Sequence, residues 1–416
     1  MRTNKHIPQG YKSSPLGPIP EDWEVKSVKD ISTIKGRIGY RGYTIDDIVN
    51  DGDGAISLSP SNIIDGKLQF NSVTSITWEK YYESPEIMLC NGDIVMVKTG
   101  SSFGKVAFVE NLPHETTINP QFVIINNIKC NNKWLCYLFD SDCIQKNVHR
   151  IIVGGAIPTM SQEEIASFRI AVPPLPEQQR IVSVLYLWDT AIEKQTALIE
   201  QLTLRKRGLM QQLLTGKKRL KGFSGEWKEL RLGEVALVIG GGTPNTDTSD
   251  YWNGNIPWFT PSEIGENKYV NVSERTISEK GLNDSSAKLL PKGTILFTSR
   301  ATIGAKAILT TEATTNQGFQ SFVVTNGNNN EFIYYYLDII LNEIKQKASG
   351  STFPEVSAES LRKIAIKIPK VNEQNAIASV LVNADKEIEI QKQKLAAMQA
   401  QKKGLMQVLL TGKRRI

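Results

Sequence analysis

The sequence has 416 residues, of which 40% are hydrophobic and 22% charged, with a net charge of +6 and a pI near 8.9. This balance is typical of a folded protein and argues against a disordered chain. No apolar run approaches the roughly 18 residues of a membrane-spanning helix, and the polar start lacks a signal-peptide core. We therefore expect a cytoplasmic protein of roughly two to four domains.

The first part, residues 1–172, reads mainly as strands and turns. Short β-branched or aromatic runs are separated by clusters of Gly, Pro, Asn and Ser, which is the pattern of half-buried strands. We expect a few helices between the strands, such as one at 132–142, so the part is predicted to be a compact α+β domain. The clearest strands are expected at 94–97, 106–109 and 122–125.

All cysteines lie in this first part, and neither they nor the histidines form a metal-binding pattern. No CxxC pair occurs, and the histidines are scattered. Reduced, mostly buried thiols and no metal site are therefore expected. The residues are Cys90, Cys130, Cys136, Cys143, His6, His114 and His149.

Residues 173–219 are expected to carry a long helix. Between 177 and 214 there is no proline and one glycine, and seam residues recur with alternating steps of four and three, which is a coiled-coil heptad pattern. The 38 residues would make a rod of roughly 57 Å. Prolines just before 177 prevent an earlier start. The seam residues are Ile181, Leu185, Trp188, Ile192, Gln195, Ile199, Leu202, Lys206, Leu209 and Leu213.

Residues 220–368 again read as strands and turns, and we expect a second α+β domain with strands at 295–297 and 322–324 and a helix at 330–347. Residues 369–416 then repeat the heptad pattern. Its seam residues are Ile377, Leu381, Ala384, Ile388, Gln391, Leu395, Met398, Lys402, Leu405 and Leu409.

Polar residues interrupt both seams at matching places. Gln195 and Lys206 in the first helix correspond to Gln391 and Lys402 in the second. Such residues can fix the register of a coiled coil, or the lysines can simply extend out of the end of the seam. The simplest hypothesis pairs the two helices within one chain, and the alternative pairs each with another chain.

The chain is a tandem duplication. A shift of 196 residues superimposes 173–220 on 369–416 with 22 identities in 48 positions and no gap. The two segments hold 17 basic and 8 acidic residues, so they carry a charge of +9 and the remaining 320 residues carry −3. Upstream the match is looser. Each copy is therefore a variable globular part followed by a nearly invariant helical part.

Three local patterns could be mistaken for catalytic motifs. Residues 100–106 resemble a phosphate-binding loop, but the loop is one residue short and lacks the final Ser or Thr. The glycines at 240–242 are not followed by a helix, as a dinucleotide site requires. Residues 119–122 resemble an amino-methyltransferase motif without its second proline. We expect no catalytic residues, no metal and no cofactor in this chain.

Several motifs resemble those of the specificity subunits of type I restriction-modification systems. Residues 173–182 are similar to their helix start, and 208–217 to their helix end. Residues 241–244 with 251–258 are similar to the opening of their target recognition domains, and 293–300 with 302–304 to a strand and loop within them. The resemblance covers the full chain, although residues 37–43 of the first domain depart from the Gly-Gly-Thr-Pro opening.

The resemblance implies two target recognition domains, 1–172 and 220–368, and two helical segments, 173–219 and 369–416, that form an antiparallel intramolecular coiled coil. It implies recognition of a split double-stranded DNA sequence, with the helices as a ruler for the gap. Half-sites about one helical turn, ~34 Å, apart suit readers on one DNA face. The implied partners are two methyltransferase subunits and restriction/translocase subunits, which would carry S-adenosylmethionine, ATP and Mg.

Candidate base contacts are polar side chains on loops, because direct readout uses such groups in the grooves. Each of them could instead contact phosphate, as at least half of protein–DNA hydrogen bonds do. The candidates are Arg37, Tyr40, Arg41, Lys98, Thr99 and Ser101 in the first domain, and Thr243, Asn245, Arg300 and Thr302 in the second.

Three other functions compete with this prediction. The chain could be the recognition part of a different modification system, which a neighbouring methyltransferase gene would discriminate. It could be a non-enzymatic coiled-coil adaptor that binds protein partners, which failure to bind DNA would favour. An enzyme with an unrecognised site is the weakest, because the two domains share no titratable constellation.

Overall fold

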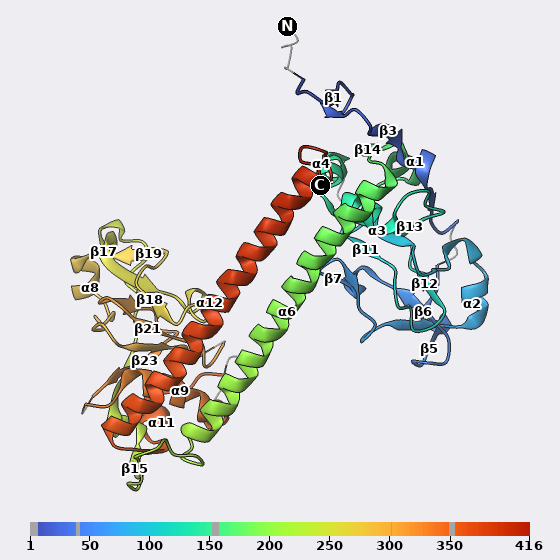
Figure 1. Cartoon of the computed structure of the whole chain (residues 1–416). Coiled ribbons are helices and arrows are strands. Elements are labelled where there is room, and N and C mark those ends of the chain that lie inside the picture. The colour runs from blue at the N-terminus through green and yellow to red at the C-terminus, as the bar shows by residue number, and fades with distance from the viewer. Residues whose placement is uncertain (1–6, 39–41, 152–157, 301, 326, 349–353) are drawn as a thin grey trace. The chain divides into compact units, whose positions relative to one another are not determined.

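The computed structural model describes residues 7–38, 42–151, 158–300, 302–325, 327–348 and 354–416 (Figure 1). The chain forms two compact units. Unit 1 comprises residues 1–195 and 394–416, and unit 2 comprises residues 196–393. Each unit therefore contains one globular part and a portion of both long helices, whereas the four sequence segments expected above keep each helix whole.

Unit 1 is built on a four-stranded antiparallel sheet in the order β11-β10-β13-β4. A second sheet, β12-β6-β9-β5, contains one parallel pair, β6 with β12. The strands of unit 1 are β1 Tyr11–Lys12, β2 Ile19–Pro20, β3 Glu24–Ser27, β4 Thr33–Lys35, β5 Ile48–Val49, β6 Ala55–Leu58, β7 Ile63–Ile64, β8 Lys67–Leu68, β9 Thr74–Ile76, β10 Ile94–Val97, β11 Val106–Phe108, β12 Thr116–Ile118, β13 Phe122–Asn126 and β14 Arg169–Val172.

The globular helices of unit 1 are short, and each begins after a residue with a polar side chain where its cap is described. Asn131, for example, accepts a hydrogen bond from Trp134 N at the start of α3 (3.0 Å), which satisfies a free backbone donor. The helices are α1 Val28–Ile31, η1 Ile45–Asp47, η2 Pro60–Asn62, α2 Trp78–Tyr82, η3 Pro85–Ile87, α3 Asn132–Asp140, α4 Asp142–Ile151 and α5 Gln162–Ser167.

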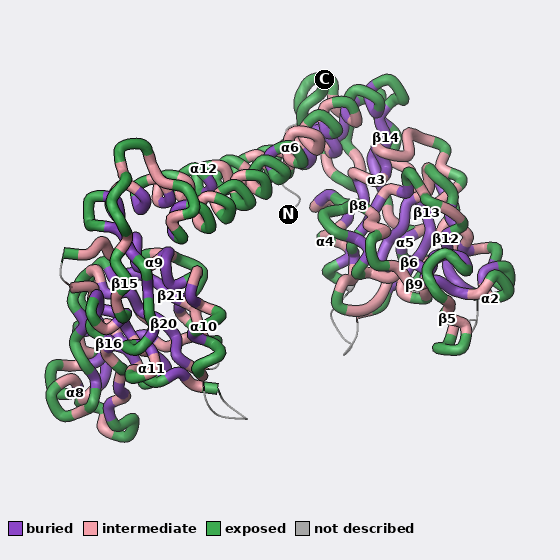
Figure 2. The backbone as a smooth tube through the Cα atoms, turned by 90° about the horizontal axis from the view of Figure 1, so that it is seen from below, coloured by how far each residue is buried: buried purple, intermediate pink, exposed green. Residues whose placement is uncertain are grey.

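The central strand β10 separates two apolar cores. Ile94 and Met96 pack with α3, α4 and the long helices, whereas Val95 and Val97 pack against the second sheet. All four side chains are fully buried, because successive residues of a strand point to opposite faces and both faces are covered. Figure 2 shows buried residues along these inner strands and exposed residues on the outer loops.

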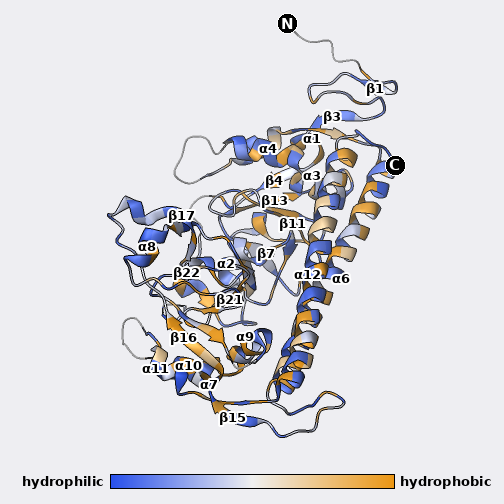
Figure 3. Ribbon diagram, turned by 90° about the vertical axis from the view of Figure 1, so that its left-hand side faces the viewer, coloured by the Kyte–Doolittle hydropathy of each residue, from blue (hydrophilic) through white to orange (hydrophobic). Residues whose placement is uncertain are grey.

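Unit 2 repeats this plan. Its main sheet has the order β16-β23-β20-β21-β18, and β19-β17-β22 forms the second. Strand β16 is strongly hydrophobic, whereas helix α9 carries both hydrophobic and hydrophilic residues (Figure 3). The elements are β15 Lys228–Arg231, α7 Leu232–Val235, β16 Ala236–Gly240, η4 Ser249–Tyr251, β17 Trp252–Phe259, η5 Pro261–Glu263, β18 Tyr269–Val270, β19 Arg275–Ile277, α8 Glu279–Asn283, β20 Ile295–Phe297, β21 Lys306–Leu309, β22 Thr314–Thr315, β23 Gln320–Val324, α9 Asn330–Ile339, α10 Leu341–Gln346, α11 Ala358–Arg362 and β24 Ala365–Ile368.

The long helices are α6 Leu175–Leu213 and α12 Val371–Leu409. All twenty seam residues named from the heptads are buried or half-buried, while neighbours such as Glu193 and Gln201 are exposed. Each helix is followed by a glycine at positive φ, Gly216 at 69° and Gly412 at 70°, the conformation in which helices commonly end.

Two expected helices are each broken. The helix expected at 132–142 is α3 followed by α4, because Ser141 is extended and its hydroxyl donates to Leu138 O (2.6 Å). The helix expected at 330–347 is α9 followed by α10, with Ile340 outside both. The strand expected at 106–109 ends one residue earlier, at Phe108. The four cysteines are free, but none is fully buried: Cys90 is exposed, and Cys130, Cys136 and Cys143 are half-buried.

Candidate nucleic-acid interface

In unit 1, Lys98, Thr99 and Ser101 lie on the loop that follows the central strand β10. Lys98 N donates to Gln121 O (2.7 Å), which holds this loop against the turn before β13. The hydroxyls of Thr99 and Thr159 are 2.7 Å apart, which ties it to a third segment. Ser101 is exposed at the tip. Three loops therefore form one polar rim on unit 1.

Unit 2 has the same rim with different side chains. Ser299 N donates to Gly318 O (2.9 Å). Arg300 forms a β-bridge with Glu355, and the corresponding bridge in unit 1 joins Thr99 to Thr159. Thr302 is exposed on the loop after β20. The backbone of the rim is thus repeated, whereas a Thr–Thr pair in unit 1 becomes an Arg–Glu pair in unit 2.

The Gly-Gly-Thr-Pro opening of unit 2 packs against this rim. A Cβ on Gly241 would lie 2.1 Å from Asn316 O, so only glycine fits there. Gly242 N donates to Thr315 O (2.8 Å), and the Thr243 hydroxyl donates to Gln317 Oε1 (2.5 Å). The motif is therefore explained by close backbone packing, and Asn245, which follows it, has an exposed side chain.

In unit 1, the side chain of Arg37 takes the place of the hydrogen bond that Gly242 N makes in unit 2. Its guanidinium donates to Ile118 O (3.2 Å), at the place that corresponds to Thr315 O in unit 2. Arg37 is 9% exposed, and burial lowers its pKa. The structure thus gives Arg37 a structural contact, and its role in base recognition stays a prediction. Tyr40 and Arg41 lie outside the described residues.

Two aromatic groups were missed in the sequence. Trp78 and Tyr82 are exposed and stacked on α2, with ring centroids 6.3 Å apart. Arg275 stacks on Trp252 at 3.6 Å in unit 2. The sequence does place Trp78 and Tyr82 four residues apart, a spacing that puts two side chains next to each other on one face of a helix. Aromatic and arginine faces can stack on unpaired bases or pack against sugars.

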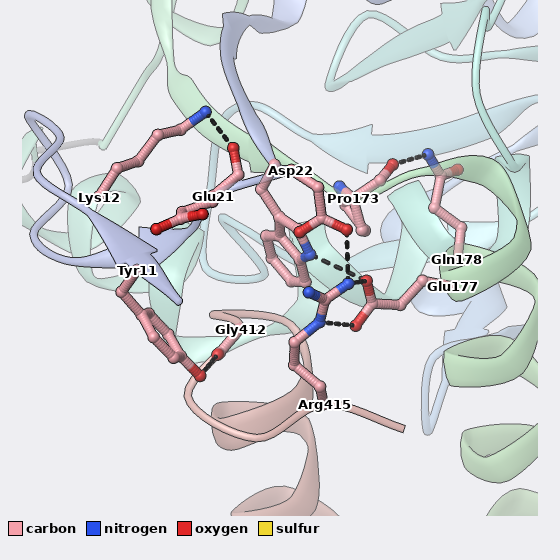
Figure 4. A network of polar contacts seen from close by, with 10 residues as sticks. Tyr11, Lys12, Glu21, Asp22, Pro173, Glu177, Gln178, Gly412 and Arg415 are labelled. Atoms are coloured by element: carbon pink, nitrogen blue, oxygen red, sulfur yellow. Dashed lines mark hydrogen bonds and ion pairs between the residues drawn. The ribbon is translucent and has the colours of Figure 1, made fainter. Parts of the chain in front are cut away.

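A polar joint fixes each globular part to the ends of the long helices. In unit 1, the Arg415 guanidinium contacts Glu177 (2.7 Å) and Asp22 (2.7 Å), and Trp23 Nε1 also donates to Glu177 (3.0 Å) (Figure 4). The hydrogen bond from Arg415 holds the pKa of Asp22 below its usual value. Tyr11 closes the same joint through Gly412 O (2.7 Å).

The joint of unit 2 keeps the ion pair and loses the indole bond. Arg219 donates from Nε (2.5 Å) and Nη2 (2.6 Å) to the two oxygens of Glu373. Trp227 lies under the guanidinium at 5.7 Å. Among the described residues, its buried indole N–H has no hydrogen-bond partner.

A second polar cluster ties the middle of the helices to each domain. In unit 1, Asp189 of α6 accepts from Lys402 of α12 (2.5 Å) and from Tyr137 of α3 (2.5 Å). Burial, together with the Asp189 carboxylate, raises the pKa of Tyr137. Within unit 1, Asp189 of α6 meets Lys402 of α12, and the earlier Glu177 of α6 meets Arg415, which follows α12, so the predicted antiparallel pairing within the chain is confirmed.

Unit 2 contains the matching cluster. Asp385 of α12 contacts Lys206 of α6 and accepts from Tyr335 of α9. Lys206 and Lys402 therefore do not simply extend into solvent: each pairs with an aspartate of the other helix. Such pairs can fix the register of an antiparallel coiled coil.

Within the described ranges, no three His, Cys, Asp or Glu side chains are grouped to hold a metal ion. No helix of the described chain has the length and apolar composition to span a membrane. What both units have in common is a polar loop rim on a rigid α+β scaffold, an arrangement suited to reading base edges and backbone of a duplex.

The comparison with known families decides what this repeat is. Residues 20–204 and 224–400 each match the family described as type I restriction modification DNA specificity domain. The chain belongs to this family. The two matches coincide with the two copies of the duplication, so the chain is a tandem pair of specificity domains.

Curated relatives of this specificity-domain protein are named as specificity subunits of type I restriction enzymes. It is 39% identical over 171 residues to the MjaIX specificity subunit of Methanocaldococcus jannaschii, over 40% of each chain. It is 26% identical to the putative MjaX specificity subunit of the same organism, over 98% of this chain and 97% of the relative. It is 30% identical to the EcoR124I/EcoR124II specificity subunit of Escherichia coli, over 55% and 57%.

Solved structures share the fold. A chain from a structure on complex assembly and conformational transition of the type I R-M system has a TM-score of 0.66 at 18% identity, and 95% of this chain and 99% of that one are covered. The HsdS subunit from Thermoanaerobacter tengcongensis has a TM-score of 0.53 at 18% identity, with 97% and 100% covered.

Proposed function

We propose that this chain is the specificity subunit of a type I restriction-modification complex and that each unit reads one half of a split DNA target. The observation that carries this proposal is the repeated rim: the same backbone presents Thr99 and Ser101 in unit 1 and Arg300 and Thr302 in unit 2. Because polar side chains select bases, two differing rims suit two different half-sites.

The exposed members of the candidate set are the first choice for base contacts. Ser101, Asn245 and Thr302 have exposed side chains. Lys98 and Arg300 are half-buried at the rim and suit phosphate as well as base edges, since lysine and arginine serve both roles. Arg37 and Thr243 hold the loops in place, Arg37 through Ile118 O and Thr243 through the side chain of Gln317.

The long helices are proposed to dock two methyltransferase subunits and, by their length, to set the gap between the half-sites. Large apolar side chains on these helices are exposed, notably Leu187 at 69%, Leu204 at 68% and Ile390 at 60%. These side chains lie off the seam that pairs the two helices, and we propose them as contacts for the methyltransferase subunits.

Methylation and cleavage are proposed to occur on partner subunits: S-adenosylmethionine on the methyltransferase subunits, and ATP and Mg on restriction/translocase subunits. This chain would supply recognition alone, in the cytoplasm. The alternative, a coiled-coil adaptor without DNA binding, has no observation in its favour beyond the helices themselves.

The test is methylome sequencing of a host that expresses the cognate methyltransferase, with and without this gene. We expect one split methyl-adenine motif to be lost on deletion and restored by the gene on a plasmid. An unchanged methylome with the methyltransferase present would contradict the proposed function and favour the adaptor.

A further inference from the structure

A cavity of about 360 Å³ lies in unit 1 beside the Tyr137–Asp189–Lys402 cluster. Strand β11, the β7–β8 hairpin, α3 and both long helices form its walls. Part of the lining is apolar or aromatic, including Leu68, Phe70, Phe108 and Tyr186. The charged lining consists of four carboxylates and three ammonium groups, which leaves one negative charge in excess.

The corresponding region of unit 2 can be identified residue by residue. Asn132 Nδ2 donates to Gly92 O and Asn330 Nδ2 donates to Gly293 O, both at 2.7 Å, which aligns α3 with α9. Asp140 therefore corresponds to Asp338.

The strand registers give the second correspondence. Val106 pairs with Met96 in β10, as Lys306 pairs with Phe297 in β20. Val106 in unit 1 thus occupies the place of Lys306 in unit 2.

Unit 2 satisfies its carboxylates with its own lysines. Lys306 pairs with Asp338, and Lys268 donates to Tyr335 (2.6 Å) and pairs with Glu331 (2.5 Å). Lys268 also lies over the ring of Tyr335 at 4.3 Å. A lysine side chain from the domain is therefore held between carboxylates and aromatic rings.

Unit 1 lacks the lysine that would pair with Asp140. Lys133 is bound to Glu110 (2.8 Å) and Lys402 to Asp189 (2.5 Å), while Lys67 pairs with Glu193 on α6. Among the described residues, no side chain donates a hydrogen bond to the Asp140 carboxylate, which lines the cavity. Asp140 is exposed to solvent, while desolvation of its carboxyl group at the cavity wall raises its pKa against the opposing charges of Lys402 and Lys403.

We propose that this cavity binds a small aliphatic primary ammonium ion, whose charged end pairs with Asp140 and whose alkyl chain lies against Leu68, Phe70 and Phe108. The ligand would take the role that the lysine at position 306 has in unit 2. The shared chemistry is an alkylammonium group, supplied by a free amine or by a lysine side chain of a partner.

The test is calorimetric titration of the full chain with n-pentylammonium, and with n-pentanol as the neutral counterpart. Saturable binding of the ammonium ion and none of the alcohol is expected. Nα-acetyl-lysine methylamide is titrated in parallel, and whichever of the two ammonium compounds binds more tightly identifies a free amine or a protein lysine as the source.

Two variants locate the site. Asp140→Asn is expected to weaken n-pentylammonium binding about tenfold or more, since a charge-assisted hydrogen bond is lost. Val106→Lys, which copies unit 2, is expected to abolish it by placing an internal ammonium group beside Asp140. The control Asp51→Asn removes the same charge on an exposed loop outside this cavity, and its affinity should match that of the original protein.

Three results would overturn the proposal: no saturable binding, equal binding of the alcohol, or unchanged affinity in Asp140→Asn. If Val106→Lys fails to fold, the n-pentylammonium affinities of Asp140→Asn and of its control still test the proposal.

Discussion

The two copies of the duplication agree at their joints and differ at their rims. Glu177 with Arg415 and Glu373 with Arg219 are the same ion pair in two units. At the rim, in contrast, Thr99 of unit 1 is replaced by Arg300 of unit 2. The difference shows that the chain uses one way of fixing a domain to the helices and two chemically distinct rims.

The comparison also separates residues that maintain the framework from residues free to vary. Gly242 N and the guanidinium of Arg37 bind corresponding carbonyl groups. A backbone contact and a side-chain contact can therefore hold the same turn. The loops can therefore differ in sequence while the sheet behind them is kept.

The largest expected effect comes from the helix cluster of unit 2. Asp385→Asn leaves Lys206 and Lys268, which are 22% and 15% exposed, without their shared carboxylate. We expect the free energy of unfolding of unit 2 to fall by about 2 kcal/mol, less than for a fully buried pair because solvent screens these charges in part. Denaturant unfolding measures this.

The matched control is Glu387→Gln on an exposed position of the same helix, which should leave the unfolding midpoint unchanged. If both variants unfolded at the same denaturant concentration as the original protein, the cluster would not stabilise the joint.

The rims should act independently. Ser101→Ala is expected to relax one half of the methylated motif and Thr302→Ala the other, each by about tenfold in discrimination, because one hydrogen bond to a base is lost. Methylome sequencing of hosts that carry each variant gives the result. A change in both half-sites from one substitution would break the assignment of one unit to one half-site.

The two joints should differ in strength. Arg219→Met leaves Glu373 without its bidentate partner, and Arg219 is 27% exposed, so we expect a loss of about 1.5 kcal/mol. Arg415→Met leaves Glu177 with the Trp23 indole bond, and Arg415 is 42% exposed, so about 1 kcal/mol is expected. Thermal unfolding of both variants tests this order, and equal losses would show that the indole bond contributes nothing.

The smallest effect concerns pH and rests on the cavity of unit 1. The pKa of Asp140 is raised by desolvation of its carboxyl group, with Lys402 and Lys403 of α12 opposing this and Asp189 of α6 and Asp142 of α4 adding to it. An ammonium ligand needs the carboxylate. Its affinity should thus be full above the raised pKa and fall as the pH drops through it, at a pH above the ordinary value of 3.8. Titrations at several pH values measure this; an affinity independent of pH would exclude Asp140 as the partner.

Much of the framework could be predicted from the sequence, because helices leave periodic signals. The heptads and the 196-residue shift locate α6 and α12 to within two residues. The partner of Lys206 could not be predicted, since a heptad pattern in one helix does not give the antiparallel register with another. Asp385 is visible as a partner only in the folded unit.

The rim was harder to predict than the helices. The loop after β10 was found because it follows a strong β-branched run. The burial of Arg37 was missed because a charged residue in a loop is ordinarily exposed. The stacked Trp78 and Tyr82 were missed because exposed aromatics on a short helix resemble core residues in sequence.

The most direct test of the central claim is a chimera in which residues 220–368 are replaced by a second copy of the first recognition domain. It is expressed with the cognate methyltransferase, and the methylome is sequenced. If each unit reads one half-site, the methylated motif should contain the first half-site twice and lose the second. A folded chimera that still methylates the original motif would contradict the account.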